Sequence, residues 1–531
     1  MRSLWSYVFV LFMLSMSALD AQAFDWQWAV QAGGSSGYCQ CSSLCSDDEG
    51  NIYLTGLYTG AITLGDITLS STEGSSDIFV AKLDPWGNWL WADGIGSYDY
   101  DKATDIVCDP DGNLVVTGIF SNTVRFGNLP IITSSGSNDI FVAKVSPSGA
   151  WLWSSRAGGS GYDIANSLDA DNQGGIYVTG CFTGTAYFPG ISSINSAGGN
   201  DIFLGRLSSQ GNWEWARRAG ASNSDEGKSL AVSPANDIIL SGKYRGTISF
   251  GDHEIVPDSN YPLFVAKADS LGNWLWANTT TGTGNAYYGD ICVDNGGNTY
   301  ITGTYAPSIS FGAYTVDNIS SEDIFVAKAG PTGEWNWAIS AGGSNSDDVS
   351  DIDVDNEGNI WIAGIFEYSL QFGDTTLSSQ GDSDLYMAKL GPAETWTWAI
   401  RTGGNNPEYL YDLYLDDENN AFLGGGFSGV STLGNTTFTP LGDTNAFALK
   451  YGTAAILISP EDLHILSENS EVQLSWIAVN GATAYKVESS AFPEGPYSDI
   501  SALGEFSGTS FSIDLPQDDN KQFFRVSAIR N

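Results

Sequence analysis

The chain has 531 residues, of which 62 are acidic and 21 basic, so its formal net charge at pH 7 is -41. A surface this acidic repels nucleic acid and anionic lipid, which excludes both as expected partners. Aromatic residues make up 13% of the chain, which is typical of a folded protein, and the length favours more than one domain.

Residues 1–23 have the pattern of a secretory signal peptide. Arg2 precedes an apolar run over residues 8–14, and the segment ends on Ala21-Gln22-Ala23, an A-x-A cleavage pattern. The run is too short to cross a bilayer, and no later stretch is long enough. We therefore expect a protein that is secreted or held at the cell surface, is monomeric and has no membrane span.

Three of the six cysteines, Cys39, Cys41 and Cys45, lie close together near the start of the mature chain. They have no second ligand pair and no histidine nearby, which argues against zinc. The sequence leaves open whether two of them form a local disulfide.

A Trp-x-Trp pair recurs seven times at intervals of 61 to 63 residues, which indicates a repeat architecture. The pairs are Trp26/Trp28, Trp89/Trp91, Trp151/Trp153, Trp213/Trp215, Trp274/Trp276, Trp335/Trp337 and Trp396/Trp398. Their use in every copy favours a structural role, filling the gap between neighbouring units, over a sugar-binding aromatic ladder.

Each repeat predicts four strands and an inserted hairpin. In the second copy we expect strands at 106–109, 114–120, 140–145 and 151–154, with the hairpin at 124–133. Four-stranded units repeated radially make a β-propeller. The chain opens on a fourth strand and the last copy lacks one, so we expect the N-terminal strand to close a seven-bladed ring over residues 24–452.

The motifs "DIFVAK", "DEGNIYLTG" and the trailing "GNWLWA" resemble the SBBP family, the bacterial seven-bladed β-propeller repeats, over about Phe24 to Gly452. The resemblance implies an exported or surface protein and does not imply an activity. Pro262 departs from the family pattern, which has an acidic residue at the start of the third strand.

The period stops after Tyr451, and alternating strands such as "VQLSW" follow. This segment, residues 457–531, resembles a fibronectin type III domain with Trp476 in its core. We therefore predict an all-β protein: a seven-bladed propeller followed by a fibronectin type III-like β-sandwich.

The residues that could carry chemistry are mainly acidic. The chain has only two histidines, His253 and His464, which removes most Ser-His, Cys-His and His-metal constellations. Asp169–Gly174 and Asp353–Gly358 begin like calcium loops but lack the closing glutamate. They are more typical of turns capped by Asp, and calcium is the alternative. We predict no catalytic residue and no other cofactor.

A second acidic set precedes the first strand of five copies, and tyrosines lie near it. We predict that these residues surround one mouth of the propeller channel, where they either cap loops or bind a ligand or cation. The candidate ligand-binding residues are Asp101, Asp163, Asp225, Asp347, Glu408, Tyr98, Tyr162, Tyr288 and Tyr409.

The leading interpretation is an exported, non-catalytic binding or scaffold protein. Its expected ligand is a glycan, a cell-surface component or a protein, bound on the face that carries the inserted hairpins and the variable loops. The alternative is a propeller-type lyase or glycosidase that works through paired carboxylates.

Overall fold

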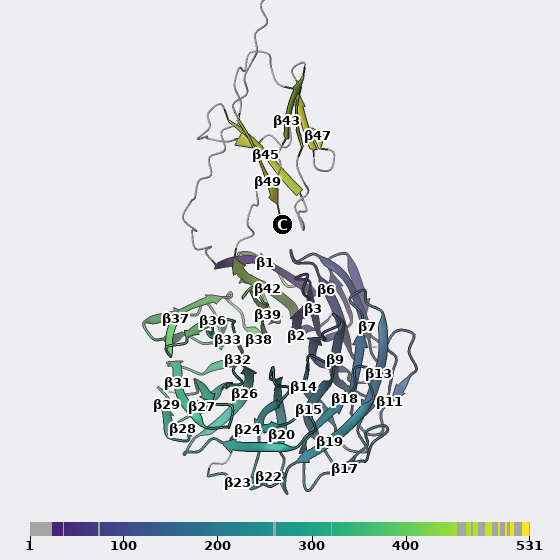
Figure 1. Cartoon of the computed structure of the whole chain (residues 1–531), viewed down its shortest axis with the longest axis vertical. Coiled ribbons are helices and arrows are strands. Elements are labelled where there is room, and N and C mark those ends of the chain that lie inside the picture. The colour runs from purple at the N-terminus through teal and green to yellow at the C-terminus, as the bar shows by residue number, and fades with distance from the viewer. Residues whose placement is uncertain are drawn as a thin grey trace, which may run out of the picture. The chain divides into compact units, whose positions relative to one another are not determined.

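The structure is a computed structural model. It describes residues 24–453, apart from residues 36, 73–74, 259–261 and 320, and the strand residues between 464 and 529. The expected signal peptide and Trp476 lie outside the described residues. The chain divides into two compact units, of which Trp26–Gly452 is the larger (Figure 1). The described residues form strands, turns and loops, with no helix among them.

The larger unit contains six blades that each take four strands from one repeat, in the sheets β2-β3-β6-β7, β8-β9-β12-β13, β14-β15-β18-β19, β20-β21-β24-β25, β26-β27-β30-β31 and β32-β33-β36-β37. We number these blades 1 to 6. All their strand pairs are antiparallel, as short connections between successive strands require. The strands expected in the second copy are confirmed.

The innermost strands are β2 (Cys39–Ser46), β8 (Lys102–Cys108), β14 (Ile164–Ala170), β20 (Glu226–Val232), β26 (Asn285–Val293) and β32 (Asp347–Val354). The second strands are β3 (Ile52–Thr59), β9 (Leu114–Phe120), β15 (Ile176–Phe182), β21 (Ile238–Lys243), β27 (Thr299–Ala306) and β33 (Ile360–Phe366). The third strands are β6 (Ser76–Leu83), β12 (Asp139–Val145), β18 (Asp201–Leu207), β24 (Leu263–Ala268), β30 (Asp323–Ala329) and β36 (Asp384–Gly391). The outer strands are β7 (Trp89–Ile95), β13 (Trp151–Ala157), β19 (Trp213–Ala219), β25 (Trp274–Thr279), β31 (Trp335–Gly343) and β37 (Thr395–Thr402).

The predicted fold class, a seven-bladed propeller followed by a sandwich, is wrong as stated. Six blades are built from single repeats, and the seventh repeat makes no blade of its own because it supplies only three strands of this kind. These strands are β38 (Glu408–Leu415), β39 (Ala421–Phe427) and β42 (Asn445–Thr453). They join β1 (Phe24–Gly33) and the β4–β5 hairpin of the first repeat in one six-stranded sheet, the composite sheet, in the order β38-β39-β42-β1-β4-β5.

The expected C-terminal β-sandwich is not evident either. Two small sheets occur there, β43-β44-β48-β47 and β46-β45-β49. Their strands are β43 (His464–Glu468), β44 (Glu471–Ser475), β45 (Ala484–Ser490), β46 (Ser498–Asp499), β47 (Glu505–Phe506), β48 (Ser510–Asp514) and β49 (Phe523–Ile529). Side-chain burial is described only for Leu474, which is buried, and for the half-buried Ser475.

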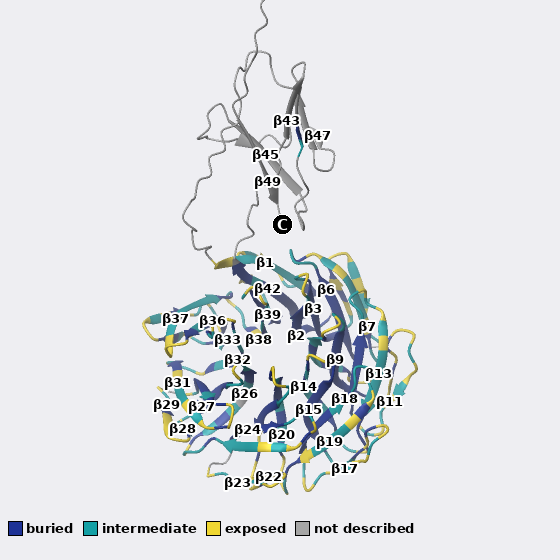
Figure 2. Cartoon of the chain, viewed as in Figure 1, coloured by how far each residue is buried: buried dark blue, intermediate teal, exposed yellow. Residues whose placement is uncertain are grey.

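The second and third strands of each blade are the core of the propeller. All residues of β9 and β12 are buried, on both faces of the sheet, because their blade lies between blades 1 and 3 (Figure 2). Each hydrophobic cluster therefore combines two neighbours: Tyr53 and Val80 of blade 1 share one with Val116 and Phe141 of blade 2. The burial of both faces explains why the "DIFVAK" segments have consecutive apolar residues and not an alternation of apolar and polar ones.

The two tryptophans of a pair have different partners. In five repeats the first packs against the Phe of the inserted hairpin, as where the ring centroids of Phe126 and Trp151 are 4.8 Å apart. The second reaches the next blade. The Nε1 of Trp91 donates a hydrogen bond to the Pro147 carbonyl at 3.0 Å, and the indole covers Gly149, which turns with φ of 84°. Trp28, Trp153 and Trp276 make the same bond to the turn that follows.

The other three second tryptophans depart from this pattern: Trp215, Trp337 and Trp398. The Nε1 of Trp215 is buried and finds no acceptor among the described residues. Arg217 makes the polar link to the next blade in its place. Its guanidinium lies 5.2 Å from the centre of the Trp215 ring and donates a hydrogen bond to the Leu271 carbonyl at 3.0 Å.

Trp337 and Trp398 contact neighbouring rings instead of bonding to a turn. The Trp337 ring lies 6.2 Å from that of Tyr300 in its own blade, and in the turn it would reach, Glu394 takes the left-handed position that glycine has in other blades. The Trp398 ring lies 5.7 Å from that of Tyr451 in the composite sheet. Both indoles are half-buried. The motif thus occurs in all seven repeats, but its second tryptophan makes different contacts from one repeat to the next.

The inserted hairpins also join blades. They are β4 (Ala61–Leu64) with β5 (Ile67–Ser70), β10 (Thr123–Val124) with β11 (Ile132–Thr133), β16 (Thr185–Ala186) with β17 (Ile194–Asn195), β22 (Ile248–Phe250) with β23 (His253–Ile255), β28 (Ser308–Phe311) with β29 (Tyr314–Asp317), β34 (Ser369–Phe372) with β35 (Thr375–Ser378), and β40 (Ser431–Leu433) with β41 (Thr436–Phe438). β34 pairs with β31 of the preceding blade, and β4 pairs with β1. The sequence did not predict this pairing.

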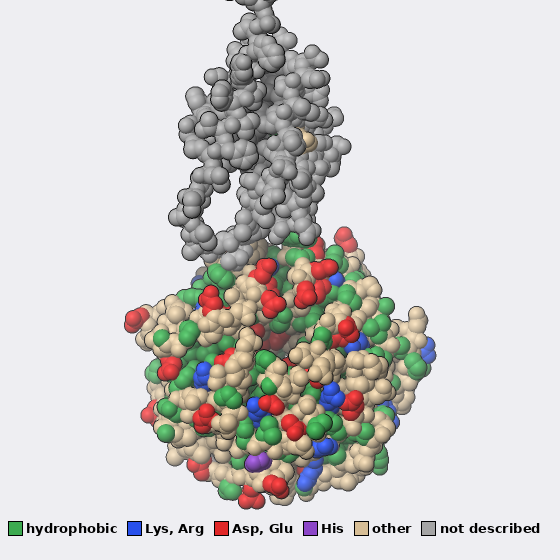
Figure 3. Space-filling model, in the orientation of Figure 1, with side chains coloured by type: hydrophobic (Ala, Val, Ile, Leu, Met, Phe, Trp, Pro, Cys, Tyr) green, Lys and Arg blue, Asp and Glu red, His purple; other side chains and the backbone are tan. Residues whose placement is uncertain are grey.

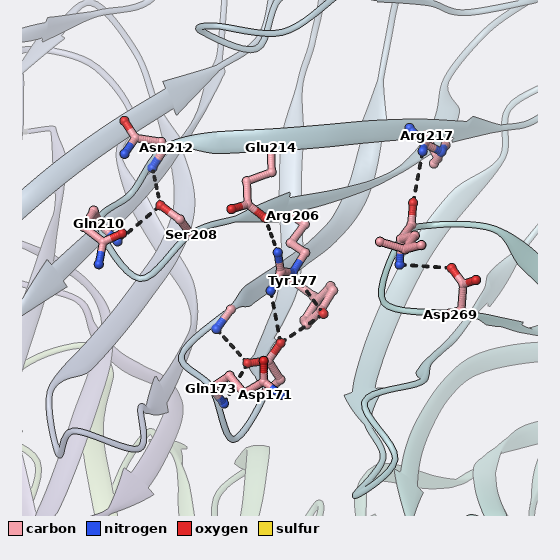
Figure 4. A network of polar contacts seen from close by, with 12 residues as sticks. Asp171, Gln173, Tyr177, Arg206, Ser208, Gln210, Asn212, Glu214, Arg217 and Asp269 are labelled. Atoms are coloured by element: carbon pink, nitrogen blue, oxygen red, sulfur yellow. Dashed lines mark hydrogen bonds and ion pairs between the residues drawn. The ribbon is translucent and has the colours of Figure 1, made fainter.

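The turn between the first two strands is held by an ion pair in several blades. In blade 3, Asp171 accepts hydrogen bonds from the backbone of Gln173 and from the Tyr177 hydroxyl, and Arg206 pairs with it at 3.4 Å (Figure 4). Lys144 and Lys389 pair with Asp109 and Asp355 in blades 2 and 6. The calcium-like segments at Asp171 and Asp355 are therefore capped turns.

We predict that Trp91→Ala lowers the free energy of unfolding by about 2–4 kcal/mol, because it removes both packing on Gly149 and the bond to Pro147. Trp91→Phe keeps most of the packing and loses only the hydrogen bond, which costs about 1 kcal/mol. Urea unfolding measures both. Trp86→Ala, in a turn outside the pairs, is the control, and equal effects of all three substitutions would contradict the inter-blade role.

Candidate binding site at the axial channel

One side chain from each of β2, β8, β14, β20, β26, β32 and β38 lies around the axis of the larger unit. We call this set the axial ring: Ser43, Asp105, Ser167, Ser229, Asp290, Asp351 and Asp412. In each strand the pairing register shifts one or two residues before the ring position, as at Ala103/Asp105 and Val349/Asp351. Such β-bulges re-aim a side chain.

The ring side chains bridge neighbouring inner strands. Asp105 accepts a hydrogen bond from the backbone N–H of Leu168 in the next blade at 2.8 Å, and Asp351 accepts one from Leu413 at 2.7 Å. Asp412 accepts one from Leu44 at 2.6 Å, which joins the composite sheet to blade 1. These strands present unpaired edges to the channel, so the side chains supply the missing acceptors.

The bulge residues supply the matching donors. Thr104 Oγ1 donates to the Ala165 carbonyl at 2.9 Å, and Ser350 Oγ donates to the Leu410 carbonyl at 2.9 Å. Asn166 Nδ2 donates to the Gly227 carbonyl at 2.7 Å. Side chains thus pair with both N–H and C=O groups of the adjoining strand.

The ring and bulge residues line a cavity of about 330 Å³ in which Lys228 is the one basic residue among the described lining residues. Burial raises the pKa of Asp105 to about 6 and that of Asp412 to about 7. Burial, with the neighbouring carboxyls of Asp290 and Asp412, also raises the pKa of Asp351. Acidic side chains are scattered over the face shown in Figure 3, including its central hollow. The channel is therefore a polar site lined by acidic side chains, some of which retain protons near neutral pH.

The five predicted carboxylates, Asp101, Asp163, Asp225, Asp347 and Glu408, lie at or just before the start of inner strands, and we call them the loop carboxylates. All are buried, with at most 1% of the residue exposed. Asp101 accepts backbone hydrogen bonds from Ser97 at 2.6 Å and Ser121 at 2.9 Å. Asp163 and Asp225 accept equivalent pairs, and Glu408 accepts from Gly404 and the Ser431 hydroxyl. Four of the five thus cap loops.

Three of the four predicted tyrosines lie at the surface instead. Tyr98 is 71% exposed, Tyr162 43% and Tyr409 39%. The Tyr288 side chain lies outside the described residues, although its backbone belongs to β26. The structure therefore separates the two kinds of predicted residue, with tyrosines outside and carboxylates inside.

Three further tyrosines that sequence reasoning missed lie near them. Tyr100 and Tyr411 are exposed, and the Tyr411 hydroxyl donates a hydrogen bond to Tyr38. Burial, with the nearby Tyr162 and Tyr38, raises the pKa of Tyr100. We call Tyr38, Tyr98, Tyr100, Tyr162, Tyr409 and Tyr411 the tyrosine rim. Their shared position just before or within the start of an inner strand was a signal available in the sequence.

No group of three or more His, Cys, Asp or Glu side chains in the described part of the chain is arranged to hold a metal ion. Calcium binding stays a prediction. All six cysteines are free thiols. Cys45 Sγ lies 3.0 Å from Cys108 Sγ of the next blade, a pair that the clustering of cysteines in the sequence did not indicate.

The radial blades and the axial cavity define the chain as a β-propeller protein, and WD-repeat-like relatives agree with this. The chain is 24% identical over 507 residues to an uncharacterized WD repeat-containing protein, L264, of Acanthamoeba polyphaga mimivirus, covering 76% of this chain and 36% of that protein. It is 26% identical over 388 residues to the regulatory protein FlaEY of Caulobacter vibrioides, covering 67% and 39%. The chain thus spans under two fifths of the length of these relatives.

No family model matches the chain, so the resemblance to the SBBP family stays a prediction. Among solved structures, a protein of unknown function from Dyadobacter fermentans is 10% identical with a TM-score of 0.42, covering 81% of this chain and 99% of that one. YCF48 bound to a D1 peptide is 12% identical with a TM-score of 0.38, covering 82% and 97%. In the described residues we find no helix long and apolar enough to span a membrane.

We predict that the free energy of unfolding falls as pH rises from 5 to 8. Asp169 and Asp353, with pKa values raised by burial to about 7, hold protons that the unfolded chain has already released in this range. Each such carboxyl contributes up to about 1.4 kcal/mol per pH unit. Carboxyls with a lowered pKa, such as Asp355, titrate below this window.

Urea unfolding at constant ionic strength measures this slope. Asp169→Asn cannot take up the proton, so we expect a shallower slope in this variant. The same change at exposed Asp252, on a hairpin, is the control. A free energy of unfolding that stays constant or increases from pH 5 to pH 8 would show that the buried carboxyls are ionised in the folded protein.

Proposed function

We propose that the protein is an exported, monomeric, non-catalytic binding or scaffold protein that recognises a glycan, a cell-surface component or a protein ligand at the mouth of the axial channel. The tyrosine rim carries this proposal. Exposed tyrosines supply large contact area with little conformational entropy to lose, and a hydroxyl that hydrogen-bonds. Five of the six are more than a third exposed, whereas most of the aromatic side chains that the structure describes are buried or half-buried.

The scaffold beneath the rim supports a binding role. Blades are joined at the axis, at the outer strand and through the hairpins, so the rim side chains project from a rigid base. A rigid base reduces the entropy lost on binding. The loops that carry the tyrosines differ between repeats, as in "SYDYD" and "NNPEYLYD", which is typical of a recognition surface.

The carboxylates support binding more than catalysis. A lyase or glycosidase needs carboxyl groups that can reach a substrate. Asp101, Asp163 and Asp225 are fully buried and accept two backbone hydrogen bonds each. Asp105 and Asp351 are likewise engaged with neighbouring strands. These groups maintain the shape of the mouth on which the tyrosines are displayed.

The test is a glycan, cell-wall and protein-ligand array probed with the full chain, run beside polysaccharide-degradation assays. For any ligand found, we predict that Tyr98→Ala, Tyr162→Ala and Tyr409→Ala together weaken binding at least about 10-fold, because exposed aromatic side chains at the mouth would form the contact. The melting temperature should change little, since these side chains are exposed.

The matched control replaces Tyr187, Tyr314 and Tyr368 with Ala. These tyrosines are similarly exposed, at 60%, 39% and 68%, but belong to the hairpin regions. If both triple variants lose binding equally, the ligand does not bind at the tyrosine rim. If the protein degrades a polysaccharide and the rim variant loses this activity, the protein is an enzyme and not a binding protein.

A further inference from the structure

Two buried carboxylates meet at five boundaries around the propeller. One opens the third strand of a blade and the other is the loop carboxylate that follows it. The pairs are Asp77/Asp101, Asp139/Asp163, Asp201/Asp225, Asp323/Asp347 and Asp384/Glu408. Burial raises the pKa of the second carboxylate in each pair, and the charge of the first carboxylate raises it further. At the other two boundaries both are absent, with Pro262/Ala286 and Asn445/Cys39 in their places.

Three of the five pairs contain a compensating arginine. Arg156 pairs with Asp139 at 2.8 Å, Arg218 with Asp201 at 2.9 Å and Arg401 with Asp384 at 2.7 Å. These arginines occupy one register position, opposite Phe141, Phe203 and Tyr386 of the third strand. A guanidinium is thus the repeat's usual means of neutralising this carboxylate pair.

Two pairs lack the arginine, and only one of them has a substitute among the described residues. In blade 1, Gly94 stands at the register position, and Asp77 accepts hydrogen bonds from the backbone and hydroxyl of Thr72 and from the Ser75 hydroxyl. In blade 5, Ser340 stands there. Asp323 accepts a backbone hydrogen bond from Ile319 at 2.6 Å, and its Oδ1 is buried with no partner in the described part of the chain.

Asp347, the other member of the blade 5 pair, is also poorly compensated. Its counterparts each have two donors, whereas the donor that faces Asp347 is the backbone N–H of Gly343. The residue is only 1% exposed, and neither carboxylate oxygen has a hydrogen bond of good geometry to a described residue. Burial, then the neighbouring Asp323, raises its pKa to about 8. A buried, ionised carboxylate without a hydrogen-bond donor or a cation costs folding free energy, so a bound cation would stabilise the ionised form at this site.

Asp347 lines a cavity of about 450 Å³ between blades 5 and 6 and the composite sheet. Four more carboxylates line it, Glu322, Asp348, Glu367 and Asp382, together with Tyr287, Tyr409 and the fully buried Phe366. None of the described lining residues is Lys or Arg. Aromatic faces beside carboxylates suit a planar organic cation, which can stack on the rings and bond to the acids.

We propose that this cavity binds a guanidinium group, presented as an arginine side chain of a partner protein or peptide. The inference rests on the proposed binding function and specifies the chemistry of its ligand. Tyr409 belongs both to the cavity lining and to the tyrosine rim, so one partner segment can contact both. The partner supplies in trans the charge that Arg156, Arg218 and Arg401 supply within the chain.

The test is calorimetric titration of the full chain with arginine amide and with a short Arg-containing peptide at low salt. We expect saturable binding to the unaltered protein. Asp347→Asn should weaken it at least about 10-fold, while Asp374→Asn, which removes an exposed hairpin carboxylate and the same net charge, should leave it unchanged. Lysine amide and Ca²⁺ are the competing probes.

Ser340→Arg is the second variant, since it restores the arginine found in blades 2, 3 and 6. We expect it to raise the melting temperature and to weaken arginine binding, because Asp323 and Asp347 then have an internal cation. The melting curve also shows that each variant is folded. Two results would overturn the guanidinium assignment. One is arginine binding that the Asp347→Asn variant keeps unchanged, and the other is arginine that is displaced by Ca²⁺ but not by lysine amide.

The outcomes separate this inference from the proposed function. An array ligand that depends on the tyrosine rim, with no binding of the arginine probes, leaves the proposed function standing and rejects the cavity. Arginine binding that requires Asp347, with no rim-dependent array ligand, supports the cavity and rejects the rim.

Discussion

The inner strand of each sheet has one edge that no backbone pairs with, and the propeller depends on how that edge is satisfied. Neighbouring inner strands converge on the axis but do not form ladders with each other. Ring side chains accept the free N–H groups, as Asp105 does from Leu168, and bulge side chains donate to the free carbonyls, as Thr104 does to Ala165. Buried backbone groups without such partners would each cost free energy of folding.

This requirement accounts for much of the acidity of the axis. A short acceptor is needed at each ring position, and Ser or Asp meets it, with Asp able to bond to two strands at once. Asp351 accepts from its own neighbour Ile352 and from Leu413 of the next sheet. The accumulated carboxyls raise each other's pKa values, so part of the formal charge of the chain is carried by groups that retain protons near neutral pH.

The sequence predicted the strands well because "DIFVAK" and the tryptophan pairs repeat at a fixed interval and report local burial. The two incomplete repeat ends predicted that the N-terminal strand lies beside the last repeat, and β1 is indeed the neighbour of β42 although the two strands lie over 400 residues apart. No local pattern shows that their sheet also takes in β4 and β5. The orientation of Asp101 or Asp163 was hidden for a different reason. A carboxylate before a strand can cap its own loop or face solvent, and only the positions of Ser97 and Gly159 decide between them.

Repeats that share the Trp-x-Trp motif nevertheless make different contacts with the next blade. The second tryptophan of a pair bonds to the next turn only where that turn offers a carbonyl within reach of the indole, as Pro147 does for Trp91. Trp215 keeps the motif and lies over Gly272 of the next turn, but its Nε1 makes no bond to a described residue. Trp398 keeps the motif and meets the ring of Tyr451 in the composite sheet. A repeat pattern thus reports the side chain and its strand, but not the partner that a neighbouring unit supplies.

Comparison of repeats separates structure from function in a chain with few obvious motifs. The loss of both carboxylates where Pro262 and Ala286 stand shows that the two positions change together, as expected for groups whose buried charges interact. Where both carboxylates are kept and the arginine is lost, as at Ser340, the balance is broken within the fold. A fold that supplies an arginine to this pair in three blades, but leaves it without an internal cation beside a cavity with no Lys or Arg among its described lining residues in a fourth, has retained a local instability there. Such instability is typical of a position where a ligand completes the charge balance.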